Sequence, residues 1–455
     1  MFRRILIANR GEVALRIART AREMGISPVG VVSTADRGSA WARQLDQTVC
    51  IGEAAPSKSY LRGEAIVQAA LQTGCSAIHP GWGFLAESPS FAALCNQHGV
   101  TFIGPSPGLI QSLGLKSPAK AAMAAAGLEV IPGSPGRLAT VQAASAWAQD
   151  VGYPVLLKAD AGGGGRGMRR CGNERELEAG FAAAAAESAA AFGDGGLYLE
   201  KCIEDGRHIE VQLLADRYGN ALHLGERECS IQRSHQKLLE ESPSPALSET
   251  DRSELGRRAA QAARTIGYIG AGTIEFLRDT NGRLYFMEMN ARLQVEHPVS
   301  EMRCGVDIVA EQLRIAANEA LSLRQDDLAL TGHTIECRIN AEDPDQGFRP
   351  TPGHLTAFSI PTDCGPGQVR IETHLAEGEE VTPHYDSLMA KVITHGLTRD
   401  AAIETMRATL NGATITGVST TIPLHLAVLD SAAFRAGNYN TSSIPGWQSP
   451  ATRTT

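Results

Sequence analysis

The sequence predicts an α/β protein that begins with a doubly wound parallel sheet and continues into a mixed α+β structure. Three observations support this prediction. Short apolar strands alternate with helical stretches over residues 4–103, a rhythm typical of parallel sheets covered by helices. A glycine-rich loop follows, at residues 161–168. From residue 204 onward, paired apolar runs flank turn residues, which indicates antiparallel hairpins.

The first part of the chain is predicted element by element from its apolar periodicity. Strands are expected at 5–8, 29–33, 48–51, 77–79 and 101–103, and helices at 12–24, 39–45, 61–73 and 89–97. We therefore expect residues 1–103 to form one domain.

The later boundaries follow from shifts in composition. Residues 104–130 predict a helical linker, and residues 131–203 a small lid-like unit with strands at 154–158 and 197–201 around a helix at 178–191. Residues 204–446 predict hairpins, among them 207–214 with 221–226, and residues 447–455 predict a disordered tail because they are polar and rich in Ser, Thr and Pro.

Composition excludes several classes of protein. A net charge of −8 argues against nucleic acid or an anionic membrane as the main partner, so any anionic ligand needs a local cluster of Lys and Arg. The nine cysteines include no C-x-x-C pair, which favours free thiols in a reducing cytoplasm. No stretch reaches the ~18 apolar residues that span a bilayer.

The most informative feature is a predicted hairpin around Asn281 and Gly282. A two-residue type I′ turn at this Asn-Gly places Glu275 opposite Glu288. Two ionised carboxylates about 5 Å apart repel by about 3 kcal/mol, and a cation between them removes that cost. Asn290 points to the same face, so the three side chains predict an all-oxygen Mg²⁺ or Mn²⁺ site. The alternative is a solvated hairpin face.

Several stretches predict a phosphate-binding region. Lys158 ends a buried strand and leads into the glycine run, whose N–H groups suit phosphate oxygens; a plain flexible loop is the alternative. Glu200–Ile203 would offer hinge backbone to an adenine edge or serve as a simple linker. His208 lies on one face of a strand, as a ligand contact or an ordinary surface residue. The donor-rich cluster 232–237 surrounds an anion or solvates a loop.

The segment after Asn290 predicts a site for a small anion. If the chain stays extended, Arg292, Gln294 and Glu296 share a face with the metal residues. An arginine grips a carboxylate or bicarbonate with two parallel N–H bonds, and Glu296 is a candidate general base. Arg338 is a further candidate for stabilising an oxyanion. The alternative is a salt-bridged surface strand.

At this point the motifs resemble a known family, the biotin carboxylase subunit of biotin-dependent carboxylases of the acetyl-CoA carboxylase type, within the ATP-grasp superfamily. The resemblance covers nearly all of residues 1–446. It is carried by 7–12, 79–87, 158–168, 232–237, 289–298 and 332–342.

The resemblance implies a Rossmann-like N-terminal domain, an ATP-grasp domain at about 120–317 with its lid and core, and a C-terminal domain at about 332–440. It also implies a cytoplasmic ligase, commonly a homodimer, that serves fatty acid biosynthesis together with carboxyltransferase subunits. Its substrates would be ATP with Mg²⁺ or Mn²⁺, bicarbonate, and biotin on a separate carrier protein.

The resemblance also implies residue roles. Residues assigned to ATP are Lys116, Lys158, Gly164, Gly165, Glu200, Lys201, Cys202, Ile203, His208, Gln232, His235, Glu275 and Glu288. The metal would be held by Glu275, Glu288 and Asn290, and bicarbonate by Lys237, Arg292, Gln294 and Val295. Glu296 would deprotonate bicarbonate and Arg338 would stabilise the biotin enolate, with carboxyphosphate as the intermediate that a closing lid protects from water.

Some positions depart from the family pattern. Ala161 stands in the glycine run, Ser234 replaces a common arginine, and 242–245 reads Ser-Pro-Ser-Pro. A biotin-accepting Ala-Met-Lys-Met is absent; the stretch ending in Lys391 resembles it faintly but lies in a predicted strand. Two alternatives stay open: another ATP-grasp ligase that joins a carboxylate to an amine, and a nucleotide-binding subunit without catalysis.

Overall fold

The computed structural model describes residues 1–160 and 168–448. The predicted glycine loop, with Gly164 and Gly165, and most of the predicted tail lie outside these residues. Three sheets organise the described chain: a parallel one near the N-terminus, a small antiparallel one, and a large antiparallel one. This arrangement confirms the predicted α/β class with a parallel N-terminal sheet. The domain boundaries given above stay predictions.

The N-terminal sheet has the order β3-β2-β1-β4-β5, with every neighbouring pair parallel. Its strands are β1 (Arg4–Ile7), β2 (Ser27–Ser33), β3 (Gln47–Gly52), β4 (Ala77–His79) and β5 (Thr101–Phe102). Helices α1 (Gly11–Glu23), α2 (Ala40–Arg43), α3 (Gly63–Gln72) and α4 (Pro89–Gln97) connect them. The predicted elements agree with these bounds to within a few residues, because the central strands β1, β2 and β4 are buried and largely apolar.

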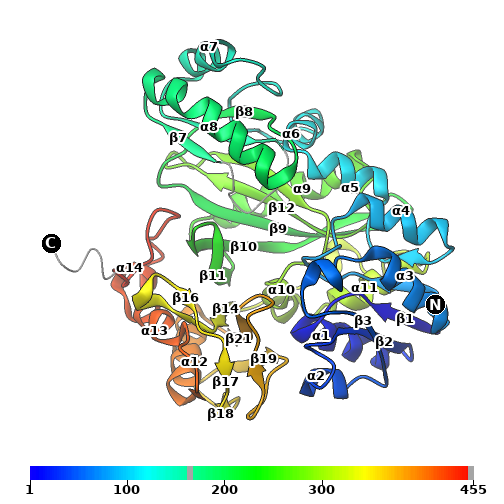
Figure 1. Ribbon diagram of the computed structural model, residues 1–455. Coiled ribbons are helices and arrows are strands. Elements are labelled where there is room, and N and C mark those ends of the chain that lie inside the picture. The colour runs from blue at the N-terminus through cyan, green and yellow to red at the C-terminus, as the bar shows by residue number, and fades with distance from the viewer. Residues whose placement is uncertain (161–167, 449–455) are drawn as a thin grey trace.

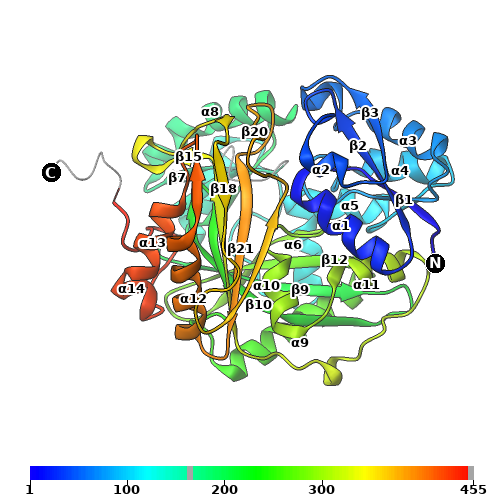
Figure 2. The ribbon, with the colours of Figure 1, turned by 90° about the horizontal axis from the view of Figure 1, so that it is seen from below.

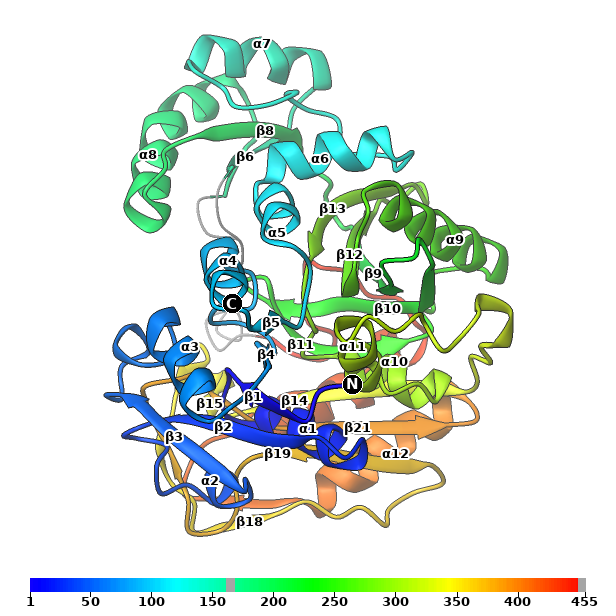
Figure 3. The ribbon, with the colours of Figure 1, turned by 90° about the vertical axis from the view of Figure 1, so that its right-hand side faces the viewer.

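A small sheet of order β7-β6-β8 stands at the top of Figure 1, beside helices α7 and α8, and the same unit projects from the rest in Figure 3. Its elements are α7 (Val141–Val151), β6 (Val155–Ala159), β7 (Arg169–Cys171), α8 (Glu174–Phe192) and β8 (Leu197–Lys201). Helices α5 (Pro107–Gly114) and α6 (Lys116–Ala125) lead into it. Its own apolar cluster contains Val155, Leu157, Leu177 and Leu199.

The large sheet runs β13-β12-β9-β10-β11-β14-β21-β19, and all of its pairs are antiparallel. Its strands are β9 (Arg207–Ala215), β10 (Ala221–Arg233), β11 (Gln236–Ser242), β12 (Gly270–Arg278), β13 (Leu284–Asn290), β14 (His333–Asn340), β19 (Gln368–Thr373) and β21 (Leu388–Gly396). Figure 2 shows these strands between the N-terminal sheet on one side and the C-terminal helices on the other.

The remaining elements cover this sheet or form short pairs. The helices are α9 (Glu249–Thr265), α10 (His297–Cys304), α11 (Ile308–Ala316), α12 (Arg399–Gly412), α13 (Ile422–Asp430) and α14 (Ala432–Arg435), with short 3₁₀ turns at Pro56–Lys58, Gln325–Asp327 and Pro344–Gln346. The short pairs are β15 (Glu342–Asp343) with β16 (Arg349–Pro350), β17 (Gly353–His354) with β20 (Glu380–Val381), and β18 (Ala357–Ser359) with β22 (Thr414–Thr416). Among the described residues, no helix is both long and apolar enough to cross a bilayer.

The hairpin of β12 and β13 pairs Glu275 with Glu288, as predicted, but its turn differs from the prediction. Asp279 donates its N–H to the Arg283 carbonyl at 2.9 Å, and of the two predicted turn residues only Gly282 has a positive φ, +91°. The loop therefore has one residue more than a type I′ turn. A register shift between Glu275 and Phe276 compensates and restores the predicted pairing.

A two-residue turn with both central residues left-handed occurs instead in the β10–β11 hairpin. Arg233 pairs with Gln236, and between them Ser234 and His235 have φ of +49° and +65°. Neither is glycine, so this turn carries backbone strain, a feature that is typical of functional segments. The strained turn places His235 at the rim of the cavity described next.

Candidate functional site

A cavity of about 720 Å³ lies over one face of the large sheet. It collects side chains from most of the predicted site: Lys116, Lys158, His208, Gln232, His235, Lys237, Glu275, Glu288, Asn290, Arg292, Gln294, Val295, Glu296 and Arg338. Its walls also include Trp82 and Gly83, which follow β4, and Tyr385 from the C-terminal part. The cavity therefore joins residues that lie far apart in the sequence.

Four directly opposed charged residues cross the sheet beneath this cavity. Glu288 on β13 faces Glu275 on β12, Glu275 faces Glu210 on β9, and Glu210 faces Arg227 on β10. Three acids in a row repel one another, so their ionisation requires cations nearby. The sheet register alone creates this row.

Lys237 on β11 supplies much of the compensation. Its Nζ lies 2.5 Å from Glu210 Oε2, 3.0 Å from Glu275 Oε1 and 2.7 Å from Glu296 Oε1. Burial opposes the charged form of Lys237, but these carboxylates raise its pKa well above the ordinary value. The ammonium group is therefore the cation at the centre of the site in this state.

Glu210 was missed by the sequence analysis. It is fully buried and contacts Arg227 Nε at 2.6 Å as well as Lys237. Burial raises its pKa, against the influence of Arg227 and Lys237. Its position two residues after His208, on the same face of an alternating strand, is the signal that identifies it.

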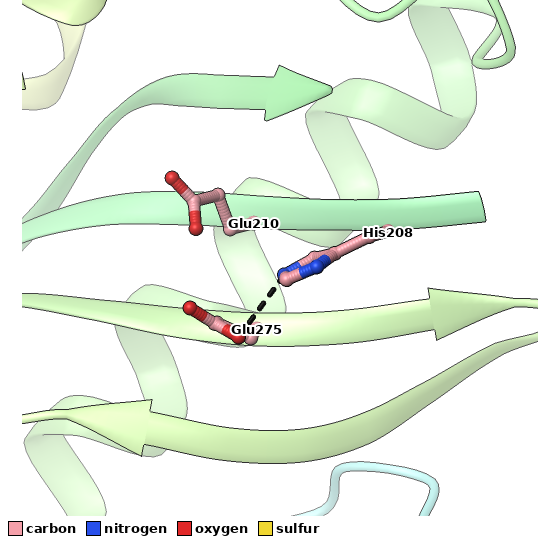
Figure 4. Close-up of side chains that lie close together, drawn as sticks. All are labelled: His208, Glu210 and Glu275. Carbon is pink, nitrogen blue, oxygen red and sulfur yellow. Dashed lines mark ion pairs between the residues drawn. The ribbon is translucent and has the colours of Figure 1, made fainter. Parts of the chain in front are cut away.

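His208 and Glu275 point toward each other from neighbouring strands, with Glu210 beside them (Figure 4); the His208 Nε2 to Glu275 Oε2 distance is 3.0 Å. Possible ligand atoms of these three side chains lie within 4.8 Å of one another. Burial lowers the pKa of His208, but Glu275 outweighs it and the net shift is upward. Lys237 and His208 thus share Glu275, so this carboxylate already has two partners within the protein.

The predicted metal residues fit a hard divalent cation. Burial opposes ionisation of Glu275, yet Lys237 and His208 hold its pKa well below its usual range. Lys116, 2.6 Å from Glu288 Oε2, lowers the pKa of Glu288. Both acids are therefore ionised near neutral pH, which suits Mg²⁺ or Mn²⁺.

Asn290 is turned away from the orientation that ligation needs. Its Nδ2 donates to Glu275 Oε1 at 2.7 Å, and its Oδ1 accepts from Arg292 Nη2 at 3.2 Å. A metal between Glu275 and Glu288 would require this amide to rotate and present its oxygen. The donor set is otherwise suitable for a hard cation.

The segment after β13 is not the extended strand predicted from the sequence. β13 ends at Asn290, and a turn precedes α10, which starts at His297. Arg292, Gln294 and Glu296 nevertheless all line the cavity together with Val295. The common face is produced by the path of the turn and not by strand alternation, so the expectation of an extended segment was wrong.

Glu296 is held between two cations. Its Oε1 contacts Lys237 as above, and its Oε2 lies 2.8 Å from Arg338 Nη2, while Arg338 Nε also donates to Glu240 Oε1 at 2.7 Å. Burial opposes ionisation, but Lys237 and Arg338 bring the pKa of Glu296 well below its usual range. Glu240, by contrast, has its pKa raised to about 7 by burial, against the influence of Arg338.

Arg292 and Gln294 complete the small-anion region. Arg292 Nε lies 2.7 Å from Glu87 Oε2, and Glu87 Oε1 also accepts from the Ala291 N–H at 2.9 Å. Glu87 is a second residue that the sequence analysis did not single out, although it ends the 79–87 motif. The Gln294 amide lies 3.2 Å from Glu296 Oε1 on one side and from Arg292 Nη1 on the other.

Glu200 lies outside the cavity and binds two lysines. Its carboxylate contacts Lys158 at 2.6 Å and Lys120 at 2.9 Å, so Lys158 has a protein partner in this state. The predicted hinge 200–203 does not line the cavity. The N–H groups of Lys201 and Cys202 donate to the carbonyls of Pro132 and Pro154. Any adenine edge must therefore pair with other hinge atoms.

Comparisons with known proteins agree with this geometry. The chain matches the family descriptions "Biotin carboxylase, N-terminal domain" over residues 1–110, "Carbamoyl-phosphate synthase L chain, ATP binding domain" over 116–324, and "Biotin carboxylase C-terminal domain" over 336–445. It is 53% identical to a biotin carboxylase of Nostoc sp., covering 97% of this chain and 98% of the relative. It is 48% identical to the 2-oxoglutarate carboxylase small subunit of Hydrogenobacter thermophilus, covering 97% and 93%.

Solved structures are similar over the same length. The biotin carboxylase domain dimer of Hydrogenobacter thermophilus 2-oxoglutarate carboxylase, in complex with MgADP, ADP and bicarbonate, has a TM-score of 0.94 at 48% identity and covers 97% of this chain and 96% of that one. The biotin carboxylase of Campylobacter jejuni, in a β,γ-ATP complex, has a TM-score of 0.94 at 46% identity, with coverages of 97% and 98%. The resemblance seen in the motifs is thereby confirmed, and the chain belongs to the biotin carboxylase family of ATP-dependent, ATP-grasp ligases.

Proposed function

We propose that this protein carboxylates biotin on a separate carrier protein, using ATP and bicarbonate, as the first half-reaction of a biotin-dependent carboxylase. The observation that carries the proposal is the pair of contacts on Glu296, with Lys237 on one oxygen and Arg338 on the other. A carboxylate and bicarbonate present the same pair of oxygens to a cation. Cations arranged to grip one are therefore arranged to grip the other.

In this proposal, bicarbonate is held by Lys237, Arg292, Gln294 and Val295. Lys237 contacts Glu296 and Arg292 contacts Glu87, so bicarbonate competes with these two carboxylates for their cations. When Lys237 and Arg338 turn from Glu296 to the substrates, the pKa of Glu296 rises. Binding of the substrate thus converts a stable carboxylate into a base that accepts the bicarbonate proton.

The nucleotide would lie between the small sheet and the large one. We assign its phosphates to Lys116 and Lys158 with Gly164 and Gly165, and its other contacts to Gln232, His235 and the hinge 200–203. A divalent ion held by Glu275, Glu288 and Asn290 would neutralise phosphate charge when bound. Arg338, which lines the cavity, would stabilise the biotin enolate.

Beyond this chain, the partners would be a biotin carboxyl carrier protein and carboxyltransferase subunits, and the assembly would contain a homodimer. We assign the chain to the acetyl-CoA carboxylase type, serving fatty acid biosynthesis in the cytoplasm. All nine cysteines are free thiols, which supports a reducing compartment. The relatives include carboxylases of other acceptors, and the choice of acceptor belongs to the carboxyltransferase.

The test is release of ADP from ATP as a function of bicarbonate, first alone, then with free biotin, then with biotinylated carrier. We expect dependence on bicarbonate, weak stimulation by free biotin and stronger stimulation by the carrier, because the carrier adds binding energy. A carboxylate–amine ligase would require an amine and ignore biotin. A subunit without catalysis would bind ATP and release no ADP.

A further inference from the structure

Lys391 lies in the stretch that resembles a biotin-accepting motif only faintly, and it has no part in the mechanism above. It is on β21, and its side chain is completely buried. A lysine is almost never fully buried without partners. Its partners therefore identify what it does.

The first partner is the backbone of the small-anion region. Lys391 Nζ donates a hydrogen bond of 2.8 Å to the Val295 carbonyl oxygen. That oxygen belongs to the planar peptide group that joins Val295 to Glu296. The contact therefore fixes the orientation of this peptide, which ends at the Cα atom that carries the Glu296 side chain. The preceding carbonyl of the turn, that of Gln294, lies 2.7 Å from His297 Nδ1. Burial lowers the pKa of His297 well below its usual range, so its neutral ring donates to this carbonyl.

The second partner is on the N-terminal side of the cavity. Lys391 Nζ lies 3.2 Å from Glu12 Oε2, and Glu12 Oε1 accepts from Trp82 Nε1 at 3.1 Å. Glu12 is in the first turn of α1, and Trp82 lines the cavity. A continuous series of contacts therefore runs from the Trp82 wall of the cavity, through Glu12 and Lys391, to the Val295 carbonyl.

The register of the sheet places Lys391 beside Arg338. The two residues are directly opposite on β21 and β14, so their side chains leave the same face of the sheet. Opposed cations on a sheet repel each other. Here Arg338 reaches the Glu296 carboxylate while Lys391 reaches the peptide just before it. Neighbouring cations thus fix one short turn at two points.

We propose that Lys391 is a positioning residue that holds the turn 294–296 in the geometry needed to bind and deprotonate bicarbonate. The inference rests on the function proposed above. A turn between a strand end and a helix start lacks a partner strand for its carbonyls, and the side chains of Lys391 and His297 replace that partner. Loss of the Lys391 contact frees the Val295–Glu296 peptide to rotate and displaces Val295 and Glu296 together.

The test compares Lys391→Met, which keeps the length and loses the donor, with Lys391→Arg, which keeps a donor. For Lys391→Met we expect the KM for bicarbonate to rise by about 10- to 100-fold and turnover to fall by a similar factor, since a misplacement of about 1 Å can cost about 10²-fold in rate. The KM for ATP should change by less than about twofold. The KM of Lys391→Arg for bicarbonate should lie between those of Lys391→Met and the parent.

Arg399→Met is the matched control. Arg399 is another largely buried cation of the C-terminal part, it donates to the Phe434 and Arg435 carbonyls, and it does not line the cavity. We expect a lower melting temperature and an unchanged bicarbonate KM. If Lys391→Met behaves like this control, or raises both KM values equally, Lys391 is only structural and the proposal is overturned.

If Lys391→Met does not fold, Glu12→Gln is the second variant, because it alters the carboxylate group that lies 3.2 Å from Lys391 Nζ and leaves the Val295 carbonyl in place. A bicarbonate KM raised about threefold or more supports the proposal, and an unchanged one overturns it. A parent enzyme whose ADP release ignores bicarbonate would contradict the proposed function itself. That outcome is separate from every outcome above.

Discussion

Replacing Glu296 with glutamine keeps the shape of the side chain and removes its charge and its basicity. The carboxylate is 1% exposed, with its oxygens 2.7 Å from Lys237 and 2.8 Å from Arg338. An amide offers one acceptor oxygen, so its NH₂ group must face one of these cations. The substitution therefore has two separable consequences, one for turnover and one for stability.

For turnover, loss of a general base costs about 10²- to 10⁴-fold, or about 3 to 5 kcal/mol of transition-state stabilisation. For stability, a hydrogen bond to a charged group contributes about 1.5 to 3 kcal/mol. Lys237 keeps Glu210 and Glu275, and Arg338 keeps Glu240, so neither cation is left alone. We expect the variant to fold and to bind ATP nearly as the parent does.

The assay is bicarbonate-dependent ADP release, with ATP affinity measured in parallel by titration calorimetry. Glu241→Gln is the matched control: Glu241 is fully buried, contacts Arg399 at 2.7 Å and His333 at 2.6 Å, and does not line the cavity. It should lose stability and keep turnover. The reasoning is refuted if Glu296→Gln retains turnover within about tenfold of the parent, or if the control loses as much.

Three other variants test separate parts of the structure. Glu288→Gln should raise the Mg²⁺ or Mn²⁺ concentration for half-maximal ADP release by about tenfold or more, because an ionised ligand becomes neutral; unchanged metal dependence would remove Glu288 as a ligand. Burial opposes ionisation of Glu241, yet His333 and Arg399 lower its pKa to about 2 from an ordinary value of 4.5, so its stabilisation, about 3 kcal/mol, is present above pH 4.5 and is lost as the pH falls toward 2. In urea unfolding, the parent and Glu241→Gln should therefore differ near neutral pH and converge in acid, and a constant difference would contradict this account. Ser234→Gly should raise the free energy of unfolding by about 1 kcal/mol, because φ is +49° at this position and glycine adopts this conformation without strain. Thermal unfolding measures the change.

The hairpin around Gly282 illustrates how far local signals reach. Alternating apolar residues and an Asn-Gly pair correctly indicated opposed Glu275 and Glu288. The turn nevertheless took one residue more, and a register shift beside Glu275 restored the pairing. The Glu275–Glu288 pairing is the one that a two-residue turn would also give, so the extra loop residue is absorbed by the register shift and leaves that pairing unchanged.

The anion-binding segment shows a different limit. Residue types at Arg292, Gln294 and Glu296 predicted a shared site, and all line the cavity. The assumed reason, an extended strand, was wrong, because α10 begins at His297 and the chain turns before it. Pro298 at the start of the helix was a visible signal for this boundary.

The sequence alone predicted the fold class and the types of residue in the site, because apolar periodicity, glycine runs and polar motifs are patterns of a few neighbouring residues. The partners of Lys237 lie 27, 38 and 59 residues away, and the burial of Glu210 depends on strands from three separate segments. Only the register of the assembled sheet, together with the path of the turn that carries Glu296, brings these charges within 3 Å. The surroundings have a low dielectric constant, so each charge shifts the pKa of the next. The ion pairs, and therefore the protonation of the site, arise from packing between distant segments.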